Sequence, residues 1–218
     1  MFNIARDERL RKFVIVTGLV ALLCYFLHVI IGQMFYPGYN PLAQAISDLT
    51  ADDSPSKAIA RIFSGLYGVF SVLTVIGLAI LVKAQSSKTI KLGVYMFTFM
   101  IMTSAIGYAI FPLSESGYSG SFQNIMHMVV TGVVVASTII SLIILIVGFR
   151  KTKTSYAYVT LLALLLLFVS SMATTQISPQ YFGIAERFSV YTVVLYLGFL
   201  VYALTSKRGL NCDYVKID

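Results

Sequence analysis

Long apolar runs alternate with short polar connections along the 218 residues of the chain. A helix needs about 20 apolar residues to cross the hydrocarbon core of a bilayer, and six runs reach that length. They cover residues 13–34, 59–82, 92–112, 122–148, 156–176 and 185–205. An outer-membrane barrel would instead show short alternating segments. Because a spanning segment must satisfy its backbone groups internally, the pattern predicts an all-α, six-transmembrane-helix bundle forming a single domain over residues 1–218.

Composition agrees with a membrane protein, because 58% of the residues are hydrophobic and only 11% are charged. Soluble domains carry about 25% charged residues. The formal charge of +7 could suggest nucleic-acid binding, but Lys and Arg occur in short clusters between the apolar runs. We therefore expect membrane lipids and no nucleic acid as partners, while protein partners are unknown. Cys24 lies in the first run and Cys212 in the polar tail, so we expect no disulfide between them.

The basic residues divide unevenly between the two sides of the predicted membrane. Thirteen of the 16 Lys and Arg residues lie in the N-terminal segment, in the second-to-third and fourth-to-fifth connections, and in the C-terminal tail. The opposite side carries Lys57, Arg61 and Arg187. Cytoplasmic loops are enriched in basic residues, so this distribution predicts that both termini lie in the cytoplasm of a multi-pass cell-membrane protein.

The connection between the first two runs contains a helical signal of its own. Asn40 suits an N-cap and Pro41 the first helical position. Leu42, Ala45, Ile46 and Leu49 then recur at helical spacing, which predicts a short interfacial helix over residues 41–49 on the outer leaflet. Small residues within the spans would allow close contact between helices. They are Gly65, Gly68, Gly77 and Gly132.

Polar side chains within the spans gather near the ends that this topology places outside. They are His28, Tyr108, Gln123, Asn124, His127, Thr131, Ser170, Ser171, Thr174, Thr175, Gln176, Glu186, Arg187 and Tyr191. An ionisable group at membrane depth costs at least about 2.5–3.5 kcal/mol on insertion scales, so such groups usually face the bundle interior. The sequence therefore predicts an outward-facing polar cavity.

His127 is the strongest candidate for a functional residue. Gln123, His127 and Thr131 are spaced by four, and Asn124 precedes His127 by three, so they share one helical face. The imidazole would either donate to a neighbouring carbonyl or take part in ligand binding or proton transfer. Asp48 is one carboxylate that could act with it in catalysis.

Glu186 is the other candidate catalytic carboxylate, and it lies in a first helical turn, where the helix dipole favours negative charge. Successive helical residues point about 100° apart, so Glu186 and Arg187 should face different directions. Arg187 shares a face with Tyr191, and we expect it to turn inward, where an acidic side chain such as Asp48 or Glu115 or an anionic ligand would pair with it.

The remaining candidates for ligand binding are Ser47 and His28, although the apolar face around His28 favours a packing role. The chain has no His-Glu-x-x-His, phosphate-binding glycine loop, CxxC pair or Gly-x-Ser-x-Gly motif. A transition-metal site would need His28, His127 and a carboxylate to converge, and axial haem ligation would use the same two histidines. We predict no metal site, and the cofactor is unknown.

Several short motifs in order resemble a known family. They are Tyr36-Pro37-Gly38-Tyr39, Ile46-Ser47-Asp48-Leu49, Phe111-Pro112, His127, and Gly183-Ile184-Ala185-Glu186-Arg187. This arrangement resembles the bacterial membrane-protein family of domain of unknown function 998 over nearly the whole chain. The resemblance implies a six-helix bacterial membrane protein and no established activity. It also groups Ser47, Asp48, His127, Glu186 and Arg187 in one site.

Three functional hypotheses remain. The first is a binding, sensing or assembly protein whose outer cavity holds a lipid headgroup or small ligand. The second is an intramembrane hydrolase or transferase acting on a lipid or lipid-linked substrate at the outer leaflet, with His127 as general base and Arg187 as an anion anchor. The third is a transporter, which the scarcity of polar residues in the inner halves disfavours.

Overall fold

A computed structural model describes residues 4–84, 87–115 and 120–206 of the chain. Lys207, Arg208, Cys212 and Lys216, which contributed to the topology and disulfide predictions, lie outside the described residues.

The described residues form six long α-helices, which confirms the predicted all-α architecture. They are α1 (Ile4–Met34), α2 (Lys57–Leu81), α3 (Lys88–Ile110), α4 (Phe122–Arg150), α5 (Thr154–Gln176) and α6 (Phe182–Thr205). Three 3-10 helices occur in the connections: η1 (Ser47–Thr50), η2 (Val82–Ala84) and η3 (Pro179–Tyr181). All six α-helices are long and apolar enough to cross a membrane. Helix α1 starts well before the predicted run 13–34, because it continues into a charged segment in which Lys12 pairs with Glu8.

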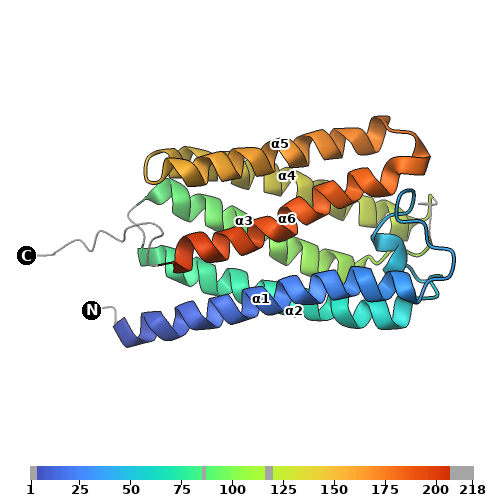
Figure 1. The fold of residues 1–218 in the computed structure, drawn as a ribbon, viewed down its shortest axis with the longest axis horizontal. Coiled ribbons are helices and arrows are strands. Elements are labelled where there is room, and N and C mark those ends of the chain that lie inside the picture. Colours follow the sequence, from blue (N-terminus) through green and yellow to red (C-terminus); the bar gives the residue numbers. More distant parts are fainter. Residues whose placement is uncertain (1–3, 85–86, 116–119, 207–218) are drawn as a thin grey trace, which may run out of the picture.

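The helices form an elongated antiparallel bundle (Figure 1). Each helix packs on the next in sequence, and α6 also packs on α1, which closes a ring. In Figure 1, α6 crosses the bundle between α1 and α5. Helix α1 begins and α6 ends at the same end of the bundle, which we call the terminal end. We call the opposite end, which carries residues 35–56, 111–115, 120–121 and 177–181, the distal end.

Large apolar side chains cover the outside of the bundle, as expected for a surface that faces lipid. Leu162, Val169 and Phe188, for example, are 57%, 65% and 59% exposed. The interior contains a main core of buried residues from all six helices and a smaller cluster near the distal end. The smaller cluster includes Tyr25 and Val29 of α1 and Leu49 of η1, so the first connection is part of the folded core.

Glycines allow close helix contacts, but mostly not at the positions expected from the sequence. A Cβ atom at Gly77 would collide with Val14, as predicted for close packing of α1 on α2. Gly65 and Gly132, in contrast, have no atom within 4 Å of such a Cβ, so their prediction was wrong. A Cβ at Gly148 of α4 would lie only 2.7 Å from the side chain of Ile90.

The predicted interfacial helix over 41–49 does not form. Only the 3-10 helix η1 follows a turn, and the segment packs on the end of the bundle. In a continuous helix, the amide of Ala45 would bond to the carbonyl of Pro41. The amide of Ala45 instead donates to Asp48 Oδ2 at 2.9 Å, and the carbonyl of Pro41 accepts from a side chain of α6. Tertiary partners thus replace the helical hydrogen bonds.

Candidate functional site

Arg187 of α6 holds the first connection against the distal end of the bundle. This side chain is 9% exposed. Its Nη1 donates to the carbonyl oxygens of Pro41, Gln44 and Gly183 at 2.7, 2.8 and 2.9 Å, and its Nη2 donates to the Tyr39 hydroxyl at 2.6 Å. A Cβ at Gly183 would lie 2.6 Å from the Pro41 oxygen, so glycine permits this close approach. Arg187 therefore turns inward, as predicted.

Glu186 reaches the same connection. Its Oε2 accepts a hydrogen bond from the amide of Ile46 at 2.6 Å. Nearby, the amide of Ile184 donates to the carbonyl of Leu42 at 3.2 Å, which satisfies one of the free N–H groups of the first turn of α6. Glu186 and Arg187 contact different parts of the same connection, since it offers an amide to Glu186 and carbonyls to Arg187.

Tyr39 extends this network by one step. Its hydroxyl accepts from Arg187 and donates to the carbonyl of Ala45 at 2.6 Å. Burial raises the pKa of Tyr39 above its ordinary value, although the nearby Arg187 acts in the opposite direction. The phenol therefore stays protonated and available as a donor at physiological pH.

A second group of polar side chains holds the connection between α3 and α4. His127 Nδ1 lies 2.9 Å from the carbonyl oxygen of Phe111, an acceptor to which the Nδ1–H tautomer donates. Gln123 donates from Nε2 to the carbonyl of Pro112 at 3.1 Å, and Asn124 Oδ1 accepts from the amide of Ser114 at 2.8 Å. The stripe predicted on α4 is real, and these contacts use it to position a loop.

Tyrosine side chains lie between these two groups. The ring of Tyr108 lies 4.8 Å from that of His127, and its hydroxyl is 3.0 Å from Thr131 Oγ1. Glu186 is close enough to Tyr25, Tyr108 and Tyr191 for its charge to act on each hydroxyl. Tyr108 thus lies near both sets of candidate residues.

Tyr25 is the centre of an aromatic cluster next to Glu186. Its ring packs edge to face against Tyr67 and Tyr191, with ring centroids 4.9 and 6.3 Å away. We define the tyrosine cluster as Tyr25, Tyr67, Tyr108 and Tyr191. Within the described part of the chain, the hydroxyls of Tyr25 and Tyr67 make no hydrogen bond to protein.

His28 also contacts this cluster. Its ring packs edge to face on Tyr25 at 5.8 Å, and the side chain is 5% exposed. Neither ring nitrogen has a hydrogen-bond partner among the described residues. A buried imidazole without partners is costly, since burying a polar group without a hydrogen bond costs roughly 1–3 kcal/mol. Packing alone, the role expected for His28, therefore does not account for its two buried ring nitrogens.

The structure brings only some of the predicted site residues together. Asp48, Glu186, Arg187 and Tyr191 lie around the first connection, whereas the α4 residues hold the second. Ser47 starts η1, and its carbonyl accepts from Thr50. Sequence reasoning missed Tyr25 and Tyr67 because a tyrosine inside a long apolar run has no distinct periodic signal.

Two further expectations concern the partner of Arg187 and the clustering of possible metal ligands. No Asp or Glu oxygen among the described residues lies within 4.0 Å of Arg187, so its partners are carbonyls instead of the expected acidic side chain. In the same part of the chain, no three His, Cys, Asp or Glu side chains lie close enough together to hold a metal ion.

Asp52 lies at the rim of the distal end, next to Lys57 and Arg61, the two basic residues of this end besides Arg187. Its Oδ1 is 2.7 Å from Lys57 Nζ and 3.0 Å from Arg61 Nη2. The hydrogen bond from Lys57, aided by the charge of Arg61, lowers the pKa of Asp52. The amide of Asp52 donates to the carbonyl of Leu113 at 3.0 Å, which links the two connections to each other.

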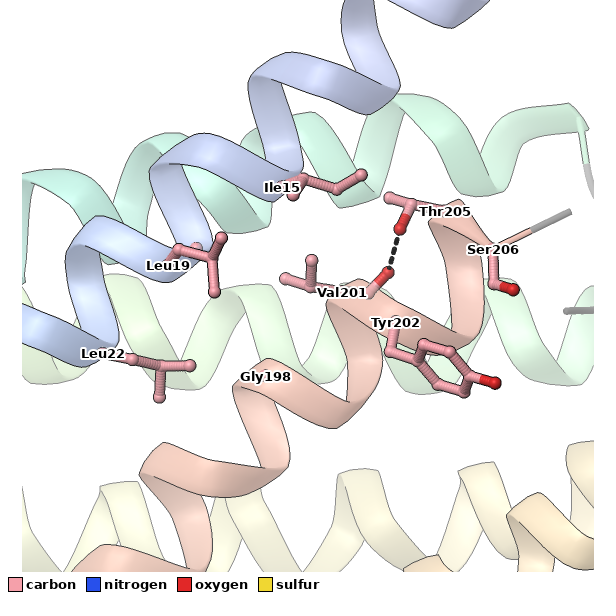
Figure 2. A pocket seen from close by; sticks show the side chains of 9 residues that line it. Ile15, Leu19, Leu22, Gly198, Val201, Tyr202, Thr205 and Ser206 are labelled. Carbon is pink, nitrogen blue, oxygen red and sulfur yellow. Dashed lines mark hydrogen bonds between the residues drawn. The ribbon is translucent and has the colours of Figure 1, made fainter.

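A groove of about 350 Å³ lies between α1 and α6 near the terminal end (Figure 2). Leu19, Leu22 and Val201 make its walls largely apolar. The hydroxyl of Thr205 donates to the carbonyl of Val201 at 2.7 Å, so it is satisfied within its own helix. This groove has no charged lining residue among those described, and its chemistry therefore differs from that of the distal end.

Six long apolar helices with a polar distal end define a multi-pass membrane protein. The chain belongs to the family described as protein of unknown function (DUF998), whose model matches residues 19–203. That span covers all of the predicted motifs. Neither the curated proteins nor the solved structures include a match to this chain.

Proposed function

We propose that this protein is a non-catalytic binding protein whose distal end faces the outside of the cell and holds a lipid headgroup or small polar ligand. The observation that carries the proposal is the environment of Glu186. Its Oε2 accepts from Ile46, while Oε1 accepts no hydrogen bond from the described part of the chain. A half-buried carboxylate with an oxygen left over, close enough to Tyr25 for its charge to act on the hydroxyl, is suited to bind a polar group from outside the protein.

The alternative, an enzyme acting on a lipid or lipid-linked substrate, has weaker support. It would use His127 as a base together with Asp48 or Glu186. The contacts of His127 with the carbonyl of Phe111 and of Asp48 with the amide of Ala45 are those of side chains that position loops. A transporter is supported less than either, because the buried residues of the terminal half are mostly apolar.

The outward orientation of the distal end can be tested by cysteine labelling. In a Cys24→Ser, Cys212→Ser background, Asp53→Cys at the distal end should react with a membrane-impermeant maleimide in intact cells. Thr152→Cys, at the exposed connection between α4 and α5, should react only after the cells are opened. The reverse pattern would place the distal end in the cytoplasm and overturn this part of the proposal.

Ligand binding can be tested by native mass spectrometry of protein extracted gently from its own membrane. We expect the wild type to retain a lipid or small molecule and Glu186→Gln to lose it, although Gln keeps an acceptor for the amide of Ile46. Tyr158→Phe is a matched control, since Tyr158 is 68% exposed near the terminal end. Release of a chemically altered ligand after incubation would favour the enzyme hypothesis, and equal retention by Glu186→Gln would exclude this site.

A further inference from the structure

The charged donors at the distal end are engaged with protein partners, which bears on the charge of the ligand. An anionic ligand is bound most strongly by charged N–H donors, and the basic residue next to Glu186 in α6 is Arg187. Its Nη1 is already shared among three carbonyl oxygens, and its Nη2 donates to Tyr39. The other basic residues of this end, Lys57 and Arg61, pair with Asp52 at the rim. An anion would have to compete with these contacts.

Negatively charged acceptors, in contrast, outnumber positively charged donors at the distal end. No Lys, Arg or His nitrogen lies within 4.0 Å of a Glu186 oxygen among the described residues. The distal end as a whole is acidic although the chain carries a formal charge of +7. Its charged residues are the acids Asp48, Asp52, Asp53, Glu115 and Glu186 and the bases Lys57, Arg61 and Arg187. The local charge therefore favours a cationic partner for the Glu186 carboxylate.

The aromatic surroundings of Glu186 point the same way. The faces of aromatic rings attract cations, and clusters of such rings with a carboxylate recognise alkylammonium groups. The ring of Tyr25 stands at 70° to that of Tyr67 and at 88° to that of Tyr191. His28, buried beside Tyr25 with both nitrogens unpartnered, adds an acceptor in its neutral form.

We propose that the ligand presents an alkylammonium group to Glu186 and to the tyrosine cluster. This inference rests on the proposed function and specifies the chemistry of its ligand. The ammonium could belong to the ethanolamine or choline headgroup of a phospholipid in the adjoining leaflet, or to a free amine. In either case the ammonium group compensates the charge of Glu186. Contacts with the faces of the aromatic rings then replace the water molecules that surround the ammonium group in solution.

The inference can be tested on delipidated protein in a maltoside detergent by thermal unfolding. The probes are choline chloride and its uncharged isostere 3,3-dimethyl-1-butanol, with sodium phosphate as an anionic probe. We expect choline alone to raise the unfolding temperature. Glu186→Gln should weaken choline binding at least tenfold, and Tyr191→Leu several-fold, whereas Tyr191→Phe, which keeps the ring, should change it little. Tyr158→Leu near the terminal end is the control.

The lipid source is tested by native mass spectrometry after adding phosphatidylethanolamine, phosphatidylcholine and phosphatidylglycerol with identical acyl chains. Selective retention of the ammonium lipids supports a lipid headgroup, and binding of choline without them supports a free amine. Preference for phosphatidylglycerol or phosphate would overturn the inference while the proposed function stands. Equal effects of choline and its isostere would also overturn it. Retention of no added compound, together with no co-purified ligand, would overturn both. The wild-type comparisons decide the matter even if a variant fails to fold.

Discussion

The two ends of the bundle are held together by different interactions. Near the terminal end, fully buried side chains such as Leu145, Phe149 and Leu197 pack between helices, alongside single hydrogen bonds such as that from Ser141 Oγ to the carbonyl of Gly93. At the distal end, Glu186 and Arg187 bond to the backbone of a connection that has little regular structure. The comparison indicates that close van der Waals packing between helices holds the terminal end together, whereas polar contacts fix the shape of the connection at the distal end.

This division also explains where a ligand could bind without destabilising the bundle. Loops held by a few polar anchors can adjust to a ligand at low cost, whereas a close-packed core cannot change by even one methylene without strain. Variants at the two ends should therefore behave differently, and the following predictions test that difference.

The largest effect should come from overpacking near the terminal end. Gly148→Val would force a side chain into Ile90, including its backbone nitrogen 3.2 Å from the added Cβ. Overpacking costs typically about 1–3 kcal/mol and more where backbone must move. We expect aggregation on gel filtration or a large drop in unfolding temperature. Gly132→Val in the same helix, with no atom within 4 Å of its Cβ, is the control. Equal stability of the two variants would show that α3 and α4 do not approach as described.

Removal of Arg187 should have the next largest effect, and it should be local. Arg187→Ala removes the partly buried hydrogen bonds to the carbonyls of Pro41 and Gln44, and a hydrogen bond to a charged group contributes about 1.5–3 kcal/mol. We expect faster hydrogen exchange in residues 39–48 with little change in residues 132–150. Glu186→Ala, which loses one hydrogen bond, should cost less.

Arg61→Ala is the matched control for Arg187→Ala, because Arg61 makes two hydrogen bonds, to Asp52 at the exposed rim and to the carbonyl of Thr50, against four for Arg187. Exposed pairs contribute only about 0.2–1 kcal/mol. Should Arg187→Ala be as mild as Arg61→Ala, the polar network would not be what holds the connection in place.

The six spans could be predicted because each depends on its own sequence. Apolar length defines them, and the N-caps Ser87 and Ser121 accept hydrogen bonds from amides three residues on. The conformation of the segment 41–49 could not be predicted. Its amides and carbonyls bond to α6, about 140 residues away, and a local helical pattern gives no sign of such distant partners. For the same reason the sequence did not show that Arg187 would use carbonyl partners.

The glycine contacts and the tyrosine cluster were unpredictable for a related reason. Gly65 and Gly148 look alike in sequence, and only the packing of neighbouring helices decides which of them meets another chain segment. Tyr25 and Tyr67 lie within apolar runs, where a tyrosine fits a packing role as well as a polar one. Their mutual contact and the proximity of Tyr25 to Glu186 appear only in three dimensions.

A smaller effect is expected at the second connection. His127→Gln keeps a side-chain donor that can reach the carbonyl of Phe111, whereas His127→Leu removes it. We expect Gln to change the stability by less than about 1 kcal/mol and Leu to cost about 1–2 kcal/mol, measured by thermal unfolding. Greater tolerance of Leu than of Gln would mean that His127 is a packing residue and that its contact with Phe111 does not stabilise the fold.

The smallest effect should be the pH dependence of the ion pairs of Asp52 with Lys57 and Arg61. Its pKa is lowered in the folded protein, so these pairs stabilise the fold above the ordinary carboxyl pKa of about 3.9 and lose this effect as the pH falls through the lower folded value. The difference in unfolding free energy between wild type and Asp52→Asn should therefore be about 0.2–1 kcal/mol at pH 6 and shrink as the pH falls below the ordinary carboxyl pKa. Because both partners are partly exposed, 1 M salt should remove most of the difference at pH 6 as well. A difference that persists at low pH and high salt would show that Asp52 acts through packing, and the rim would then resemble the terminal end more than the polar network around Arg187.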